Sequence, residues 1–405
     1  MKYPEDWKMV TIGTYGRLEK VGVNPSSTPN IMFTEYSMPA YDLGCKPACV
    51  LGKTMLSTRN LISGEVLLFN KLNVRKKRVW HVKNCPPNAV ASGEFLAYKS
   101  DELDLSLLCQ ILMTDSVTAT FDEMSTGTSN SQKRIHPTNF LNFEILLPSS
   151  IEEQYQISKV LENADQLIDN LEKRIAKKRA IKQGAMQELL TGKKRLPGFT
   201  GEWKMVKLGK LSTIKARIGW QGLTTAEYLT DGEYYLVNGI NIEAGKVIWR
   251  KCFMVDKKRY NQDKNIQLRK HDVLVSKDGT IGKVAYVTDL PKLATLNSGV
   301  FVIRTTDSTI LQEYLARIFL SKWFDNFVKK ITAGSTIVHL YQKDIVGFSF
   351  MVPPTIAEQR AIAKILSDMD DEISILERKL EKVKAVKQGM MQDLLTGKVR
   401  LRGQA

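Results

Sequence analysis

The chain has 405 residues, which is long enough for two or three domains with cores of their own. Its formal net charge is +16, and basic proteins of this size often bind nucleic acid. No apolar run approaches the roughly twenty residues that a membrane-spanning helix needs, and the N-terminus has no signal-peptide pattern, so we expect a cytoplasmic protein without a membrane partner. The five cysteines are odd in number and form no CxxC pair, which argues against a disulfide framework or a standard zinc module.

Residues 1–150 have the texture of a mixed α/β domain. Short apolar runs predict strands at residues 65–69 and 143–147. Residues 103–113 are apolar enough for a buried helix, and residues 91–98 predict a turn followed by a strand. We therefore expect a first globular domain in this segment.

Residues 151–195 predict one long helix. A serine precedes acidic residues in the first turn, which is a helix start signal, and Gly192 is placed as a C-terminal cap. The apolar residues are spaced alternately four and three apart, which is the narrow seam of a coiled coil. The seam residues are Ile157, Leu161, Ala164, Ile168, Leu171 and Ile175. Because one helix cannot bury such a stripe alone, it must pack against another helix.

Residues 196–355 predict a second mixed α/β domain with the same frame as the first. The two domains open on similar segments, Trp7-Lys-Met-Val-Thr-Ile-Gly and Trp203-Lys-Met-Val-Lys-Leu-Gly. Their interiors differ, and residues 278–283 (Asp-Gly-Thr-Ile-Gly-Lys) have no counterpart in the first domain. We expect three strands and one helix, at residues 272–276, 284–287, 300–304 and 310–330.

Residues 356–405 repeat the first helix at a constant offset (356 − 151 = 205), and about half of the positions are identical. The densest match joins Ala180-Ile-Lys-Gln-Gly-Ala-Met-Gln-Glu-Leu-Leu-Thr-Gly-Lys193 to Ala385-Val-Lys-Gln-Gly-Met-Met-Gln-Asp-Leu-Leu-Thr-Gly-Lys398. Gly184 and Gly389 each cost a helix about 1 kcal/mol relative to Ala, and they indicate a kink or a close helix contact. The economical arrangement packs the two copies on each other. Periodicity alone leaves parallel and antiparallel pairing open, and two unrelated dimerisation helices remain an alternative.

The repeat is also cyclic. The second copy stops at Arg400-Leu-Arg-Gly, where the first continues through Pro197-Gly-Phe-Thr-Gly-Glu-Trp203. The start of the chain, Tyr3-Pro-Glu-Asp-Trp7, resembles this missing continuation, as if the two termini lay together. Two equivalent domains joined by two equivalent helices are most simply related by a twofold axis, which makes the helices antiparallel. We expect an α/β protein: two mixed α/β domains separated by two long antiparallel coiled-coil helices, in a pseudo-twofold, cyclic repeat. Two different domains on a fixed spacer imply a split target whose halves differ.

Several of these motifs are shared with one family. They are the pairs Glu153-Gln154 and Glu358-Gln359, the K-Q-G-x-M-Q-[ED]-L-L-T-G-K block and the L-P-G-F-x-G-E-W join. With this layout the chain resembles type I restriction–modification specificity subunits over essentially its whole length, although the domain interiors add little except residues 278–283. The resemblance implies that residues 1–150 and 196–355 are target-recognition domains, each reading one half of a bipartite asymmetric site in double-stranded DNA. It also implies that the helices set the spacer and dock two methyltransferase (modification) subunits, with restriction/translocase subunits outside them.

The resemblance implies no cofactor in this chain, because adenine N6 methylation from S-adenosylmethionine and ATP-driven cleavage with Mg belong to the partner subunits. The sequence agrees. The Pro-Pro pairs, Cys85-Pro86-Pro87-Asn88 and Val352-Pro353-Pro354-Thr355, do not form the Asn/Asp-Pro-Pro-aromatic run of an adenine methyltransferase. No P-loop is present either. We expect a non-catalytic subunit without catalytic or metal-binding residues. The alternatives are a self-contained DNA-modifying enzyme, which the missing motifs oppose, and a coiled-coil scaffold whose domains bind protein, which the basic charge opposes.

Candidate DNA-binding residues are basic, amide, hydroxyl and aromatic side chains in expected loops, since Lys and Arg contact phosphates and several polar types read bases. In the first domain they are Lys71, Arg75, Lys76, Lys77 and Arg78, beside Trp80, with Lys133 and Arg134. In the second they are Arg217, Trp220, Gln221, Lys257, Lys258, Arg259, Tyr260, Lys277 and Thr280. For any single one of these residues, a solvated surface position is the alternative. The basic face of the first helix is more simply a solvated coiled-coil face, with DNA or a partner subunit as the alternative neighbour.

Overall fold

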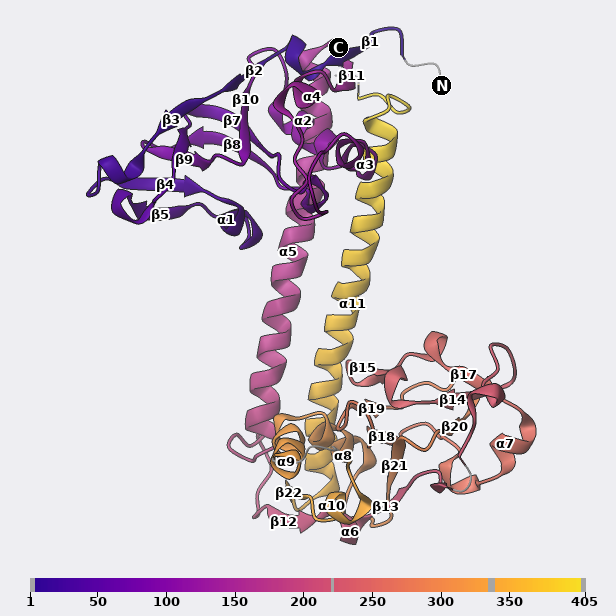
Figure 1. The fold of residues 1–405 in the computed structure, drawn as a ribbon. Coiled ribbons are helices and arrows are strands. Elements are labelled where there is room, and N and C mark those ends of the chain that lie inside the picture. The colour runs from indigo at the N-terminus through magenta and orange to yellow at the C-terminus, as the bar shows by residue number, and fades with distance from the viewer. Residues whose placement is uncertain (1–3, 220–221, 334–338, 402–405) are drawn as a thin grey trace. The chain divides into compact units, whose positions relative to one another are not determined.

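The computed structural model describes residues 4–219, 222–333 and 339–401. By its contacts the chain forms two compact units, one of Met1–Glu172 with Arg378–Ala405 and the other of Lys173–Glu377. Two long helices, α5 (Ile151–Leu189) and α11 (Ile356–Leu394), each contribute one half to each unit (Figure 1). Within the described ranges, no helix is long and apolar enough to cross a membrane.

The domain in unit 1 contains a four-stranded and a five-stranded sheet. The four-stranded sheet has the order β2 (Arg17–Glu19), β10 (Phe95–Lys99), β7 (Gly64–Asn70), β8 (Val79–Cys85). The five-stranded sheet has the order β3 (Val21–Val23), β6 (Arg59–Leu61), β9 (Ala89–Ser92), β4 (Met32–Tyr36), β5 (Ala48–Leu51). The helices are α1 (Met38–Asp42), α2 (Leu105–Leu112), α3 (Asp115–Glu123) and α4 (Pro137–Leu141). Strands β1 (Trp7–Thr11) and β11 (Glu144–Pro148) pair antiparallel and bring the two ends of the domain together.

The domain in unit 2 repeats this plan. Its four-stranded sheet has the order β13 (Ser212–Lys215), β21 (Val300–Thr305), β18 (Val273–Ser276), β19 (Val284–Tyr286). A three-stranded sheet has the order β17 (Phe253–Val255), β14 (Tyr234–Val237), β20 (Leu293–Leu296), and β15 (Ile242–Glu243) forms a hairpin with β16 (Lys246–Val247). The helices are α6 (Leu208–Leu211), α7 (Lys257–Asn261), α8 (Gln312–Phe319), α9 (Lys322–Thr332) and α10 (Gln342–Ile345). Strands β12 (Lys204–Lys207) and β22 (Ser349–Val352) close the domain as β1 and β11 close the other.

The interiors of the two domains are therefore equivalent in topology although they differ in sequence. Each four-stranded sheet has the same order and the same antiparallel neighbours, and β4–β9 in one domain and β14–β20 in the other are parallel pairs. Residues 278–283, which have no counterpart in the sequence of the first domain, lie in the connection between β18 and β19. Its counterpart is the β7–β8 connection, residues 71–78. Loops of different length and sequence occupy the same place in the fold, which sequence comparison alone misses.

Most of the expected elements are confirmed, with two corrections. Residues 310–330 form two helices, because the chain bends at Leu320 and Ser321, whose hydroxyl accepts a hydrogen bond from the backbone N–H of Trp323 (3.2 Å). Residues 91–98 hold the end of β9, a turn and most of β10, rather than a turn and one strand.

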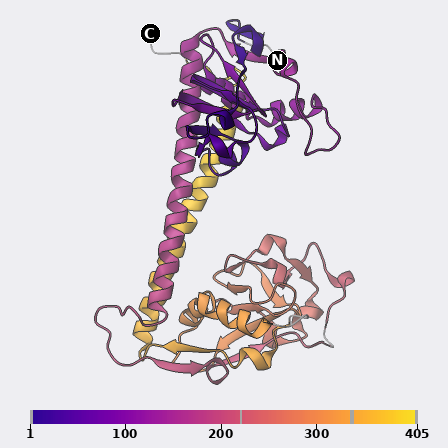
Figure 2. The same ribbon diagram turned by 60° about the vertical axis from the view of Figure 1, so that its left-hand side comes forward.

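The long helices pair antiparallel, as the cyclic repeat predicts. Each has 39 residues, and at 1.5 Å per residue each is about 58 Å long. In unit 2, Lys182 pairs with Asp370 and Arg179 with Glu377; in unit 1, the equivalent Lys387 pairs with Asp165 and Lys384 with Glu172. In each unit the half of α5 lies alongside the half of α11 (Figures 1 and 2). Buried seam residues of the two helices are Ile157, Leu161, Leu171, Ile175, Ile362, Leu366, Ile373, Leu376 and Leu380.

The helix ends explain the Glu-Gln motif. Arg195, just beyond the end of α5, makes two hydrogen bonds to the Glu358 carboxylate (2.7 and 2.9 Å), and Glu358 is fully buried. Arg400 does the same to Glu153 (2.5 and 2.6 Å). Glutamines 154 and 359 donate to backbone carbonyls before their helices, at 2.9 and 3.3 Å. Each motif thus locks a helix start to its own domain and to the end of the other helix.

The two junctions also show the predicted cyclic relation. Trp203 lies under Arg195, with the guanidinium carbon 5.8 Å from the ring centre, and Trp7 lies under Arg400 at 5.9 Å. Trp7 comes from the start of the chain and Arg400 from its end. Trp7 therefore contacts the end of α11 in the same way as Trp203 contacts the end of α5. Gly192 and Gly397, beyond the helix ends, adopt the left-handed conformation expected of C-terminal caps (φ 72° and 70°).

Replacing Arg195 by Ala is expected to lower the free energy of unfolding by about 3 kcal/mol, because it leaves the buried Glu358 carboxylate without its partner. Urea denaturation measures the change. The matched control is Lys178→Ala, which removes a half-exposed pair with Glu372 and should cost less than about 1 kcal/mol. Equal effects of the two substitutions would contradict a structural role for the Glu-Gln motif.

Candidate nucleic-acid interface and partner surface

The predicted basic residues of the first domain come together on one surface. Strands β7 and β8 are joined by residues 71–78, and the segment around Arg134 lies against this connection, with the Asn73 N–H donating to the Lys133 carbonyl (2.8 Å). Asn73 and Lys77 have positive φ (53° and 48°), so the connection turns sharply twice. The structure therefore gathers the residues that the sequence grouped.

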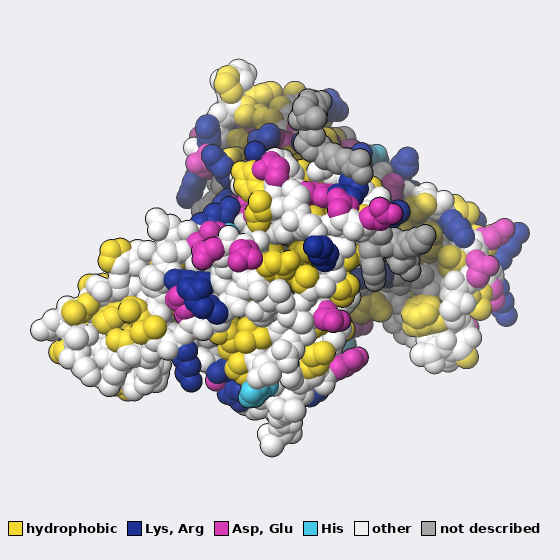
Figure 3. All heavy atoms as spheres, turned by 90° about the horizontal axis from the view of Figure 1, so that it is seen from above, with side chains coloured by type: hydrophobic (Ala, Val, Ile, Leu, Met, Phe, Trp, Pro, Cys, Tyr) yellow, Lys and Arg dark blue, Asp and Glu magenta, His cyan; other side chains and the backbone are white. Residues whose placement is uncertain are grey.

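Most of these cations are already neutralised within the domain. The ion pairs are Arg75–Asp122 (3.5 Å), Lys77–Asp115 (2.5 Å), Arg78–Asp42 (2.6 Å) and Arg134–Glu94 (3.0 Å). The hydrogen bond from Arg78 lowers the pKa of Asp42, and that from Lys77 lowers the pKa of Asp115. On the face shown in Figure 3, Lys and Arg side chains lie beside Asp and Glu rather than in one continuous patch. Among the described residues, Lys71, Lys76 and Lys133 have no ion pair, so they are the cations of this group that are free to meet phosphates.

Arg217 has a structural role, and its predicted place in a DNA-contacting group requires correction. It is 2% exposed, and its guanidinium donates to the Leu296 carbonyl (2.9 Å) and to Gln262 (3.1 Å). Burial lowers its pKa. The guanidinium therefore holds the segment after β13 to strand β20. Its predicted neighbours Trp220 and Gln221 lie outside the described residues.

The remaining candidates of the second domain lie at two places. On α7, Lys257 and Lys258 are exposed, whereas Arg259 pairs with Glu227 (2.5 Å) and its hydrogen bond lowers the pKa of Glu227 to about 2. Tyr260 stacks on Tyr234 with ring centres 4.5 Å apart.

Lys277 and Thr280 lie instead in the β18–β19 connection, the counterpart of residues 71–78. Thr280 is exposed, and its carbonyl accepts a hydrogen bond from the Ser276 hydroxyl (2.6 Å). The corresponding position in both domains thus carries candidate DNA-binding residues.

A second candidate surface lies on the helices, within the densest match between the two copies of the repeat. Residues at spacings of three, one, three and four fall on one side of a helix. In α5 and the turn after it they are Ala180, Gln183, Gly184, Gln187 and Thr191; in α11 and the turn after it, Ala385, Gln388, Gly389, Gln392 and Thr396. The two sets are identical, and we call each one a repeated face. All of these residues are exposed except Thr191, which is partly buried.

The fold does not require the two repeated faces to have the same residues. At positions that flank this face on the same turns, Lys178, Ile181 and Ala185 are replaced in the second copy by Val383, Val386 and Met390. A Cβ added at Gly184 or Gly389 would meet no atom of the chain within 4 Å, so neither glycine marks the intrachain helix contact that was one prediction. Each helix also continues unbroken through its glycine. The five positions of the repeated face thus agree between the copies, whereas these flanking positions differ.

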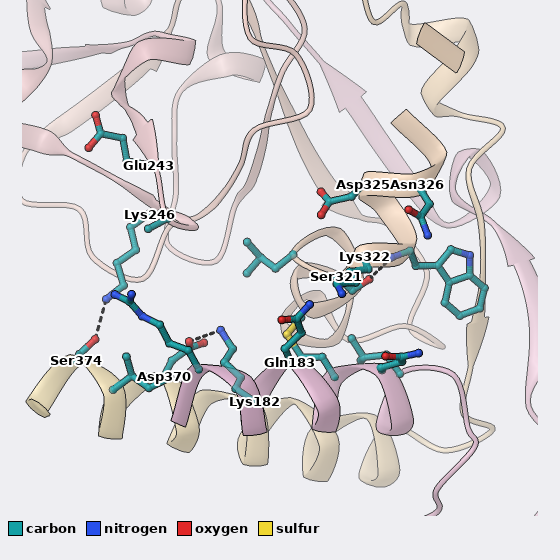
Figure 4. A pocket seen from close by; sticks show the side chains of 18 of the residues that line it. Lys182, Gln183, Glu243, Lys246, Ser321, Lys322, Asp325, Asn326, Asp370 and Ser374 are labelled. Carbon is teal, nitrogen blue, oxygen red and sulfur yellow. Dashed lines mark hydrogen bonds and ion pairs between the residues drawn. The ribbon is translucent and has the colours of Figure 1, made fainter. Parts of the chain in front are cut away.

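Each repeated face borders a cavity. In unit 2 a cavity of about 970 Å³ lies between the helices and the bend between α8 and α9. Figure 4 shows Gln183 of α5 on one wall and Ser321 and Lys322 opposite, with Lys182 and Asp370 paired at the base. In unit 1 a cavity of about 730 Å³ is lined by the equivalent positions of α11 and by the bend between α2 and α3. The shared lining positions are 179, 182, 183, 186, 187, 190 and 191 in unit 2, and 384, 387, 388, 391, 392, 395 and 396 in unit 1.

The chain is similar to restriction–modification proteins in sequence and in fold. Residues 200–385 match the model of the type I restriction modification DNA specificity domain. The chain is 24% identical over 438 aligned residues to the type I restriction enzyme MjaVIII specificity subunit of Methanocaldococcus jannaschii, an alignment that covers 99% of this chain and 95% of that one. The fold is similar to the type I restriction–modification S subunit from M. genitalium (TM-score 0.66, 15% identity, 97% and 98% of the chains). It is also similar to a chain from a structure on complex assembly and conformational transition of the type I R-M system (TM-score 0.57, 17% identity, 98% and 100%).

The fold has two mixed α/β domains and an antiparallel helix pair, and residues 200–385 carry a type I restriction modification DNA specificity domain. The chain is thus similar to the specificity subunits of type I restriction–modification systems, and the resemblance carried by the repeated blocks is confirmed.

Proposed function

We propose that each domain of this chain reads one half of a bipartite, asymmetric site in double-stranded DNA. The observation that carries the proposal is the shared topology of two domains whose loops differ. Equivalent scaffolds bring the β7–β8 and β18–β19 connections to the same place, and the loop sequences there are unlike. Because bases are read by side chains on such loops, equal scaffolds with unequal loops suit two half-sites of different sequence.

Two methyltransferase subunits dock on the two repeated faces in this proposal. A partner in two copies needs the same surface twice, and each unit offers that surface once, beside an equivalent cavity. Gly184 and Gly389 leave room for a closely packed partner helix, which gives a reason for keeping glycines that each weaken an exposed helix by about 1 kcal/mol. Restriction/translocase subunits join the complex outside these contacts.

The chain itself supplies no chemistry in this proposal. Methyl transfer from S-adenosylmethionine and ATP- and Mg-dependent cleavage reside in the partner subunits. The absence of an Asn/Asp-Pro-Pro-aromatic run and of a P-loop from the sequence supports this division of roles.

DNA binding by the purified chain, with and without its methyltransferase, tests the proposal. We expect the chain alone to bind duplex DNA weakly and without sequence preference, and the complex to bind selectively. The logarithm of the DNA affinity should fall linearly with the logarithm of the salt concentration. Methyl transfer should require the partner. A chain that methylates DNA alone would contradict the non-catalytic role, and a complex whose DNA affinity is insensitive to salt would favour a protein-binding scaffold.

A further inference from the structure

Two lysines occupy the same position in the two domains. Strand β7 ends at Asn70 and is followed by Lys71; strand β18 ends at Ser276 and is followed by Lys277. In the neighbouring strands, Phe95 faces Asn70 and Val300 faces Ser276, so the registers of the two sheets agree.

The backbone around each lysine is held in the same way. The Lys71 N–H donates to the Glu94 carbonyl (3.0 Å), and its own carbonyl accepts from the Ile135 N–H (3.0 Å). The Lys277 N–H donates to the Gly299 carbonyl (2.9 Å), and its carbonyl accepts from the Leu340 N–H (3.0 Å). Ile135 and Leu340 are each 1% exposed, so both lysines are fixed to buried parts of their domains. The two lysines are therefore held at equivalent backbone positions, and both are partly exposed.

The residue before each lysine shapes the loop that follows, by different means. The Asn70 side-chain carbonyl accepts from the Leu72 N–H (2.7 Å). The Ser276 hydroxyl accepts from the Lys283 N–H (2.9 Å) and so closes a different loop. Both domains therefore have a lysine at this position, but the loops that follow the lysine differ.

Both lysines also keep their charge available. Next to Lys71, Arg134 is neutralised by Glu94 at 3.0 Å; next to Lys277, His339 contacts Asp278 at 2.5 Å. Over the ranges that the structure covers, neither lysine has a carboxylate partner, and the Lys277 ammonium lies 5.6 Å from the ring centre of Phe301. An aromatic ring orients an ammonium group without neutralising it.

We propose that Lys71 and Lys277 are equivalent phosphate anchors, one in each domain, that hold DNA without reading its sequence. The inference rests on the proposed DNA-reading function and assigns it two positioning residues. A lysine is a compact point charge that suits a phosphate whatever the base. A residue common to both domains cannot distinguish two different half-sites, so the unlike loops beyond it carry the sequence selectivity.

The test uses the complex of the full chain with its methyltransferase and the substitutions Lys71→Ala and Lys277→Ala. Each substitution should reduce the slope of log affinity against log salt by about one, weaken specific and non-specific DNA binding by the same factor, and leave the methylated motif unchanged. Matched controls are Lys53→Ala and Lys270→Ala, which remove the same charge from exposed positions that the two domains do not share and that lie outside the candidate DNA-binding residues. The controls should change the slope by less than half as much. Assembly with the methyltransferase confirms that each variant is folded.

Three results would overturn the inference. Slopes that change no more than in the controls would make the lysines ordinary surface residues. A change in the methylated motif would make them base-reading residues. An unaltered complex without salt-dependent DNA binding would overturn the proposed function, and the anchors with it, whereas the first two results leave that function standing.

Discussion

Exchanging residues 1–150 for the first domain of another type I specificity subunit is expected to change one half of the methylated motif and to leave the other half unchanged. The structure makes this segment separable, because the pairing of β1 with β11 brings its two ends together, with Trp7 opposite Pro148. The graft must keep Trp7 and Asp6, which contact Arg400. Mapping of methylated adenines in cells that express the hybrid chain with the methyltransferase measures the result.

The matched exchange of residues 204–352 should change only the other half of the motif. Its ends are also paired, with Lys204 opposite Val352. A hybrid that keeps the parental motif, or that changes both halves, would contradict the assignment of one half-site to each domain.

The substitutions Gly184→Gln and Gly389→Gln are expected to have opposite effects on docking and on stability. Glutamine is a strong helix former and its Cβ would meet no neighbouring atom within 4 Å, so each change should stabilise its helix by about 0.8 kcal/mol. The same side chain fills the space left for a partner helix. Native mass spectrometry should find two methyltransferases on the unaltered chain, one on either single variant and none on the double variant.

The controls are Arg174→Gln and Lys379→Gln, which place the same side chain ten residues before each glycine, about 15 Å away along the helix and outside the repeated face. Both positions are exposed. Both control variants should carry two methyltransferases. A double glycine variant that still binds two would show that the partners dock elsewhere, and a loss of binding with reduced stability would indicate misfolding rather than a blocked surface.

The architecture was predictable because it rests on repeats. The seam spacing from Ile157 to Ile175 predicts a paired helix, and the cyclic relation between Trp7 and Trp203 predicts antiparallel pairing. Both signals are local or repeated in the sequence, so neither depends on the domain interiors. The break between α8 and α9 at Leu320 and Ser321 was harder to predict from the sequence. The apolar pattern continues through the break, and only the serine cap marks the bend.

The candidate site was predictable only as clusters of residues. The sequence groups Arg217 with basic and aromatic neighbours, but burial and the Leu296 carbonyl decide its role, and both depend on strand pairing. The ion pairs of Arg78 and Arg134 join residues 36 and 40 positions apart, which composition does not disclose. The repeated faces, in contrast, were within reach of the sequence, because a helical wheel places Gln183, Gly184 and Gln187 on one side of the helix, and the second copy has the same residue types at the same places.

The most direct measurement of the central claim is co-expression of this chain with the methyltransferase of its own system, followed by mapping of methylated adenines on host DNA. The account predicts one split, asymmetric motif that appears only when both proteins are present. Methylation without this chain, or no methylation from a pair that forms a stable complex, would contradict it.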